Sequence, residues 1–358
     1  MNALANPARL NYIDNLRAFA FSMMLLFHTL KLFSPEGWGI HLTPLPGAHL
    51  AAEIITSWRL PLLFFISGAA FSISIKQKNI LNRTARKLLP VLIIGTPVLV
   101  SVANYLHDRY INPVAGLLSH FSTYFQNTLR GVLSWYHLWY LGYILFFVAI
   151  HQATYDLIKK LGISISQKQL LWVLSITVLV TFVNEWLLRP FFPVRRNFYS
   201  DIASLVSFAC YYMAGMTLIK LPASLKLNAA LAWPLSAVAL MAVFIHFSVS
   251  LLPLAITKTI IAWSAIFALN RLFYRYLNIK LALTKALHNK LLDIYVIHQL
   301  TLLAATFITI YLPDGLLKIC VIFTIGYALA YLAGSTKYYI KYLIKKMIKS
   351  KTHLTDAQ

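Results

Sequence analysis

The stretch that decides the fold is Ile13–Phe33, which reads IDNLRAFAFSMMLLFHTLKLF. About 20 apolar residues are enough for a helix to cross a bilayer, so this stretch predicts a transmembrane helix. It nevertheless contains Arg17 and His28. Ionisable side chains inside a span are costly, and they mark a candidate functional site. At ~3.6 residues per turn and ~1.5 Å rise per residue, these two side chains share one helix face and lie ~16 Å apart.

The composition of the whole chain is that of a membrane protein. Of its 358 residues, 59% are hydrophobic and only 12% are charged, which is far from the usual values for soluble domains. A net charge of +22 in a soluble protein would suggest nucleic-acid binding. Here the basic residues recur in short clusters between hydrophobic stretches, as the positive-inside rule describes. We therefore expect membrane lipids, and no nucleic acid, as partners.

The hydrophobic stretches predict an all-α membrane protein, a single bundle of about ten transmembrane helices. If the N-terminus is cytoplasmic, the cytoplasmic loops and ends hold 22 of the 32 Lys and Arg residues and the outer loops hold five. This asymmetry places both termini in the cytoplasm. The expected spans are residues 13–34, 49–75, 88–107, 135–154, 169–187, 201–219, 229–248, 253–270, 289–312 and 316–336.

Two further ionisable residues are expected deep in the membrane. Arg59, in the second span, is predicted at a depth similar to that of His28, where it either binds an anionic group or pairs with Glu53. His298, in the ninth span, is predicted near the middle of the bilayer beside Gln299. It either completes a polar network in the core or takes part in chemistry.

Other polar residues are expected closer to the membrane surfaces. His137 is predicted at the outer end of the fourth span, where Trp139 and Tyr140 fit an interfacial aromatic belt. On the cytoplasmic side, Arg83 and Arg86 are spaced to share one face of a helix. Such a pair either serves as an ordinary topology signal or binds phosphates bidentately.

Common catalytic motifs are missing from the sequence. It contains no Gly-rich phosphate loop, no metal-ligand spacing such as HExxH or CxxC, and no GxSxG turn. Cys210 and Cys320 both fall inside predicted spans, so we expect no disulfide framework and no metal. Any chemistry must therefore use the histidines, arginines and carboxylates within the membrane.

The motifs, in their order along the chain, resemble those of a known family. The R-x10-H spacing of Arg17 and His28 is followed by LPLLFFISGAAF, then by R-x-x-R-K-L-L-P from Arg83. HLWYL begins at His137 and YVIHQ begins at Tyr295. The chain resembles the acyltransferase 3 family of integral membrane acyltransferases, which O-acylate bacterial surface and periplasmic glycans.

The resemblance implies a membrane O-acyltransferase of the bacterial inner membrane. It would transfer a short acyl group, acetyl or succinyl, from cytoplasmic acyl-CoA to a hydroxyl of an extracytoplasmic glycan, with acetyl-CoA as the preferred donor. The acceptor would be a glycan or a lipid-linked saccharide, and a homo-oligomer is left open. We divide the chain into a membrane acyltransferase domain, 1–350, and a short polar cytoplasmic tail, 351–358.

Roles for the site residues follow from the resemblance together with the expected depths. His28 would act as general base, since an unperturbed imidazole titrates near neutral pH, or would form an acyl-histidine. The phosphates of coenzyme A would bind to Arg17, Arg83 and Arg86. Arg59, His298 or Tyr295 would stabilise the oxyanion or orient His28.

Other functional classes remain as alternatives. A transporter or flippase of a lipid-linked saccharide would also use charges within the membrane, but the sequence shows no paired helix breaks in two halves. A member of the other large superfamily of membrane O-acyltransferases would lack the R-x10-H spacing in its first span. A purely structural membrane protein would not need His28 and Arg59 at one depth.

Overall fold

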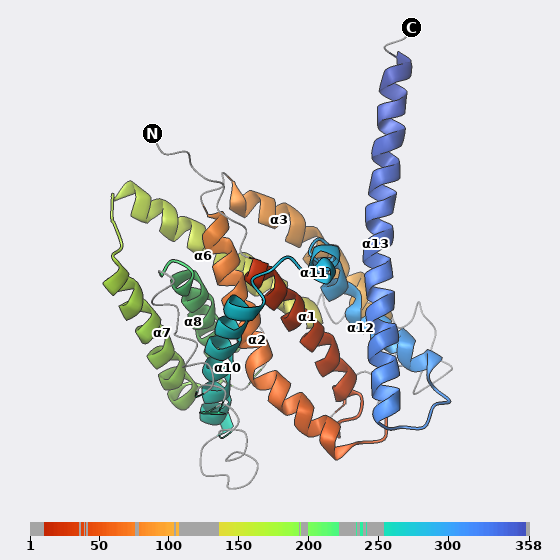
Figure 1. Ribbon diagram of the computed structural model, residues 1–358, viewed down its shortest axis with the longest axis horizontal. Coiled ribbons are helices and arrows are strands. Elements are labelled where there is room, and N and C mark those ends of the chain that lie inside the picture. The colour runs from red at the N-terminus through yellow and green to blue at the C-terminus, as the bar shows by residue number, and fades with distance from the viewer. Residues whose placement is uncertain are drawn as a thin grey trace.

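All regular elements that the structure describes are helices (Figure 1). The structure is a computed structural model, and an isolated β-bridge joins Trp38 and Ile40 in the connection after the first helix. The described residues are 11–35, 37, 38, 40, 42–75, 79–103, 105, 106, 136–192, 194, 200–221, 234, 237, 238, 241 and 254–355.

The observed helices agree with nine of the ten expected spans, and the tenth, 229–248, lies largely outside the described residues. Short helices η2 and α11 precede α6 and α12. The helices are α1 (Asn11–Lys31), α2 (Pro46–Ser74), α3 (Ile80–Pro90) continuing into η1 (Val91–Val100), η2 (Tyr136–Leu138), α6 (Trp139–Lys160), α7 (Gln167–Leu187), α8 (Ile202–Leu218), α10 (Leu254–Tyr276), α11 (Ala282–Leu287), α12 (Leu291–Ile308) and α13 (Leu316–Thr355).

The described helices confirm a multi-pass, all-helical architecture. Seven of them are long and apolar enough to cross a membrane, and α8 is apolar but shorter. Helix α1 has sufficient length, but its ionisable residues make it more polar than those seven. It lies between α2 on one side and α12 and α13 on the other (Figure 1). A total of ten spans and cytoplasmic termini remain predictions.

Helix α7 shows the inverted polarity of a helix that faces lipid. Its buried side chains are polar: Thr177, Thr181 and Asn184. The Asn184 amide donates to the hydroxyl of Ser207 and to a backbone carbonyl of α8. Large apolar side chains on α7 are exposed instead: Trp172, Ile176, Leu179, Val180, Val183, Trp186 and Leu187. Interhelical hydrogen bonds inside and apolar side chains outside are typical of helices packed within a bilayer.

Two glycines set the close packing of α2 against α8. A Cβ atom on Gly68 would overlap the carbonyl oxygen of Tyr212, and one on Gly215 would overlap the carbonyl oxygen of Phe65. Small residues allow membrane helices to approach closely, and close approach maximises van der Waals contact. This contact fixes the position of α2, the helix that carries Arg59.

The two ends of the bundle carry different polar contacts. At one end, called here the basic end, Asn15 near the start of α1 donates to the carbonyls of Leu277 and Ile279 beyond α10. Helix α13 extends beyond the other helices at this end (Figure 1). At the opposite end, Asp314 accepts hydrogen bonds from the backbone N–H of Thr43 and from Lys318. The α12–α13 connection is thereby tied to the α1–α2 connection.

Candidate functional site

Helix α1 places Arg17 and His28 on one continuous helix, as the sequence predicted. Arg17 lies toward the basic end, and its guanidinium carbon is 5.9 Å from the centroid of the Phe21 ring. His28 lies one turn before the opposite end of the helix and is half-buried. Arg17 and His28 therefore lie near opposite ends of the same helix.

Three histidines from different parts of the chain meet beside α1. The ring centroid of His298 on α12 lies 4.9 Å from that of His28 and 5.5 Å from that of His137. His298 is fully buried and His137 is 8% exposed. We refer to His28, His137 and His298 as the histidine cluster. The predicted proximity of His28 and His298 is thus present in the structure.

The position of His137 differs from the sequence prediction. Helix α6 is preceded by the η2 turn, which is docked on α12 inside the bundle. The Tyr295 hydroxyl donates to the carbonyl of His137, and the His137 Nε2 atom lies 3.0 Å from the carbonyl oxygen of Val296. Trp139 and Tyr140 are also buried in the aromatic core, so their assignment to an interfacial belt is wrong.

Arg59 projects from α2 toward the part of α1 that carries His28. It is 3% exposed, with its guanidinium carbon 4.0 Å from the centroid of the Phe27 ring and its Nη1 atom 3.5 Å from the Met24 carbonyl oxygen. Glu53, its suggested partner in the sequence, instead binds Lys31 and Lys258 at 3.5 and 3.0 Å. A buried guanidinium beside His28 is suited to stabilising negative charge that develops there.

A cavity of about 320 Å³ lies near the basic end. Arg17, Arg83 and Lys87 supply its cationic groups. Tyr295 also lines it, and the ring centroid of Tyr295 lies 5.8 Å from that of His298. We call this space the basic cavity. One residue, Tyr295, therefore belongs both to its wall and to the surroundings of the cluster.

The structure brings only one of the two predicted α3 arginines to the basic cavity. Arg83, Thr84, Lys87 and Leu88 line the cavity from α3, as expected of positions one turn apart on a helix. Arg86 is exposed and is not among the lining residues. The second cationic group on this face is Lys87, which the sequence analysis did not single out.

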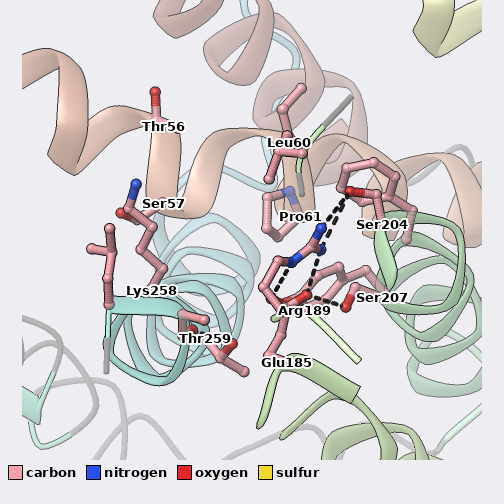
Figure 2. Close-up of a pocket in the computed structure, with 15 residues that line it drawn as sticks. Thr56, Ser57, Leu60, Pro61, Glu185, Arg189, Ser204, Ser207, Lys258 and Thr259 are labelled. Carbon is pink, nitrogen blue, oxygen red and sulfur yellow. Dashed lines mark hydrogen bonds and ion pairs between the residues drawn. The ribbon is translucent and has the colours of Figure 1, made fainter. Parts of the chain in front are cut away.

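A second cavity, of about 360 Å³, lies near the opposite end between α2, α7, α8 and α10 (Figure 2). Glu185 binds the guanidinium of Arg189 through two hydrogen bonds of 2.8 Å and accepts one from Ser207. Arg189 also pairs with Asp201 at 3.0 Å. Burial lowers the pKa of Arg189, but the two carboxylates outweigh this effect and hold it above its usual value. Glu185, Arg189 and Asp201 are thus parts of one structural network.

Helix α2 presents different side chains to this second cavity and to α1. Ser57, Leu60 and Pro61 line it from α2, whereas Arg59 on the same helix points toward α1.

Comparison with known proteins agrees with the geometry of α1. A family model described as an acyltransferase domain matches residues 10–335, which is most of the chain. The chain belongs to the acyltransferase 3 family. No curated protein sequence and no solved structure matches it significantly.

Membership in the acyltransferase 3 family makes the chain a membrane acyltransferase. The matched region contains every member of the histidine cluster and all the cations of the basic cavity. Among the described residues, no group of three or more His, Cys, Asp or Glu side chains is arranged to hold a metal ion.

Two further residues near His28 were not predicted by the sequence. Trp38 follows α1, its Nε1 atom donates to the His28 carbonyl at 2.5 Å, and its ring centroid lies 5.0 Å from that of His28. His137 was noted only as part of a motif. The aromatic residue Trp38 in the connection after α1 was the available signal for the first, and none was available for the burial of the second.

Proposed function

We propose that this acyltransferase 3 protein transfers a short acyl group, acetyl or succinyl, from acyl-CoA to a hydroxyl of an extracytoplasmic glycan or lipid-linked saccharide. Acetyl-CoA is the preferred donor and the bacterial inner membrane the proposed location. The observation that carries the proposal is the double position of Tyr295, which lines the basic cavity and contacts His298. A donor held in that cavity would have its reactive end near the histidine cluster.

The charges at the mouth of the basic cavity support a phosphate-bearing donor. Arg17, Arg83 and Lys87 come from α1 and α3, and no carboxylate is among the lining residues. Guanidinium groups bind phosphates with paired hydrogen bonds, and a lysine adds a compact positive charge. The apolar part of the lining, which includes Phe21, Ile66 and Ile144, suits a long and thin pantetheine arm.

The chemistry proposed at the cluster is general-base catalysis. His28 takes the proton of an acceptor hydroxyl while the oxygen attacks the thioester carbonyl. The guanidinium of Arg59 stabilises the oxyanion that develops on that carbonyl. When the carbon–sulfur bond breaks, the proton on His28 passes to the departing thiolate, so that acyl ester and free coenzyme A are the products. Transfer through an acyl-histidine is the alternative route.

Acetyl transfer in proteoliposomes tests the proposal. Purified protein is reconstituted with radiolabelled acetyl-CoA on one side and a mixture of bacterial glycans on the other, and the label in glycan is counted. Wild type should label glycan and release coenzyme A, whereas His28→Ala should do neither. Activity retained in His28→Ala, or saccharide movement without coenzyme A release, would contradict it, and the latter would indicate a transporter.

Mass spectrometry of surface glycans and periplasmic glucans, from cells with and without the protein, identifies the acyl group and the acceptor. A mass gain of acetyl or of succinyl on one glycan is the expected result. The same acylation pattern in both cell types would contradict the proposed reaction.

A further inference from the structure

The hydrogen bonds inside the histidine cluster determine which nitrogen carries the proton on two of its rings. The Nδ1 atom of His298 lies 2.5 Å from the Tyr295 carbonyl oxygen, and the Nε2 atom of His137 lies 3.0 Å from that of Val296. A carbonyl oxygen only accepts hydrogen bonds, so each of these nitrogens must be an N–H donor. When the two rings are neutral, His298 Nε2 and His137 Nδ1 carry no hydrogen and can only accept hydrogen bonds. We call these two atoms the bare nitrogens.

Neither bare nitrogen has a hydrogen-bond partner in the described part of the chain. Both atoms are buried away from solvent. Buried polar groups in proteins are nearly always satisfied, and the exceptions call for a functional or structural explanation. For His298, the nearest ring with an N–H to offer is that of His28, whose centroid is 4.9 Å away. An N–H···N bond of ~2.9 Å between two imidazoles requires about this centroid separation.

His137 packs against the ring of His298 but does not line the basic cavity. Its backbone carbonyl is held by the Tyr295 hydroxyl, and its side chain is held by the Val296 carbonyl. Its ring stands at 86° to that of His298, edge to face. His137 is not among the residues that line the basic cavity.

We propose that His137 is a positioning residue: it docks the start of α6 on α12 and holds the ring of His298 so that its bare Nε2 faces and orients His28. The inference rests on the proposed function, because it assigns a role within that reaction. His28 then keeps its N–H toward His298, and its other ring nitrogen receives the proton of the acceptor hydroxyl. This positioning role requires the N–H of the His137 ring, and it does not require the ring to change its protonation state.

Two substitutions at His137 separate these roles. Glutamine carries an amide N–H at about the position of Nε2 but cannot titrate, whereas alanine has neither property. We expect His137→Ala to lower kcat about 100-fold with the KM for acetyl-CoA changed less than threefold. We expect His137→Gln to retain kcat within about fivefold of wild type.

A double-mutant cycle distinguishes positioning from a general structural role. If His137 acts through His298, the double variant His137→Ala/His298→Ala should be no slower than His298→Ala alone. Independent structural damage would instead add to the loss. Thermal unfolding in detergent, monitored by tryptophan fluorescence, shows which variants are folded, and only these are compared. His137→Gln provides the test if His137→Ala does not fold.

The possible failures are distinguishable. Folded His137→Gln that is as inactive as His137→Ala would overturn the inference, as would additive losses in the double variant. In both cases His28→Ala would still be inactive, and the proposed acyl transfer would stand. Activity retained in His28→Ala would instead contradict the proposed function and, with it, the assignment of His137.

Discussion

The imidazole rings of His28 and His298 lie 4.9 Å apart, centroid to centroid, although the first belongs to α1 and the second to α12. The residues between them form most of the bundle. Contact between α1 and α12 creates this pair, and the start of α6 adds His137 to it. The candidate catalytic centre is therefore a property of helix packing.

Removing the His298 ring should slow the chemical step. General-base assistance contributes about 10²–10⁴-fold to rates, and His28 would lose the group that orients it. We expect His298→Ala to lower kcat at least 100-fold with little change in the KM for acetyl-CoA, measured as label transferred to glycan. His151→Ala is the control, since His151 is also buried but binds the Tyr212 hydroxyl away from the cluster. Comparable losses in both variants would show that the effect is structural.

The cations of α3 provide a matched set for donor binding. All three side chains are exposed, but Arg83 and Lys87 line the basic cavity and Arg86, between them, does not. Hydrogen bonds to charged groups contribute about 1.5–3 kcal/mol, so Arg83→Ala and Lys87→Ala should each raise the KM for acetyl-CoA about tenfold or more. Arg86→Ala should raise it less than threefold. The same rise in all three variants would indicate that α3 acts only through its net charge.

The glycine contact between α2 and α8 should be sensitive to a single methyl group. Gly68→Ala would force the two backbones apart, because its Cβ would overlap the carbonyl oxygen of Tyr212. Overpacking of this kind costs about 1–3 kcal/mol, and we expect a lower unfolding temperature in detergent. Gly47→Ala is the control, since nothing lies within 4 Å of a Cβ added there. An unchanged unfolding temperature in Gly68→Ala would contradict the observed packing.

The Asp314 contact at the opposite end should be sensitive to acid. Burial raises the pKa of Asp314, but the bonds from Thr43 and Lys318 outweigh it and hold this pKa below its usual value. A depressed carboxyl pKa adds stability that is fully present above the unfolded value of about 4 and is lost as the pH falls through the folded pKa.

The comparison of wild type with Asp314→Asn measures this contribution. Because the ion pair is partly exposed, we expect a difference of about 1 kcal/mol. It should be constant from pH 7 to about pH 5, begin to fall near pH 4, and be lost as the pH falls through the lowered pKa of Asp314. Unfolding in detergent as a function of pH gives both curves. A difference that grows toward low pH would have the wrong sign for this mechanism.

Much of the fold could be predicted from the sequence because the bilayer constrains it strongly. A span must be helical and about 20 residues long, so hydropathy alone located α1, α2, α6 and α12 within a few residues. The cost of burying charge singled out Arg17, His28, Arg59 and His298 without any knowledge of packing. These predictions depend on local composition.

The errors concern burial and orientation about the helix axis. His137 precedes a hydrophobic helix, so composition placed it at a surface, whereas the Tyr295 hydroxyl and the Val296 carbonyl hold it inside the bundle. On α3, the spacing of Arg83 and Arg86 fitted one helix face, but the orientation of the helix turned Lys87 toward the cavity instead. Hydropathy carries no information about either quantity.

The sequence by itself determined that this is a helical membrane protein with Arg17 and His28 on one helix, because bilayer thickness and helix periodicity act on neighbouring residues. Only the tertiary structure decided that His28, His298 and His137 form one cluster and that Tyr295 connects it with the basic cavity. These contacts join α1, η2 and α12, which are distant in sequence. Their meeting depends on how side chains from all the helices pack together, which no local pattern encodes.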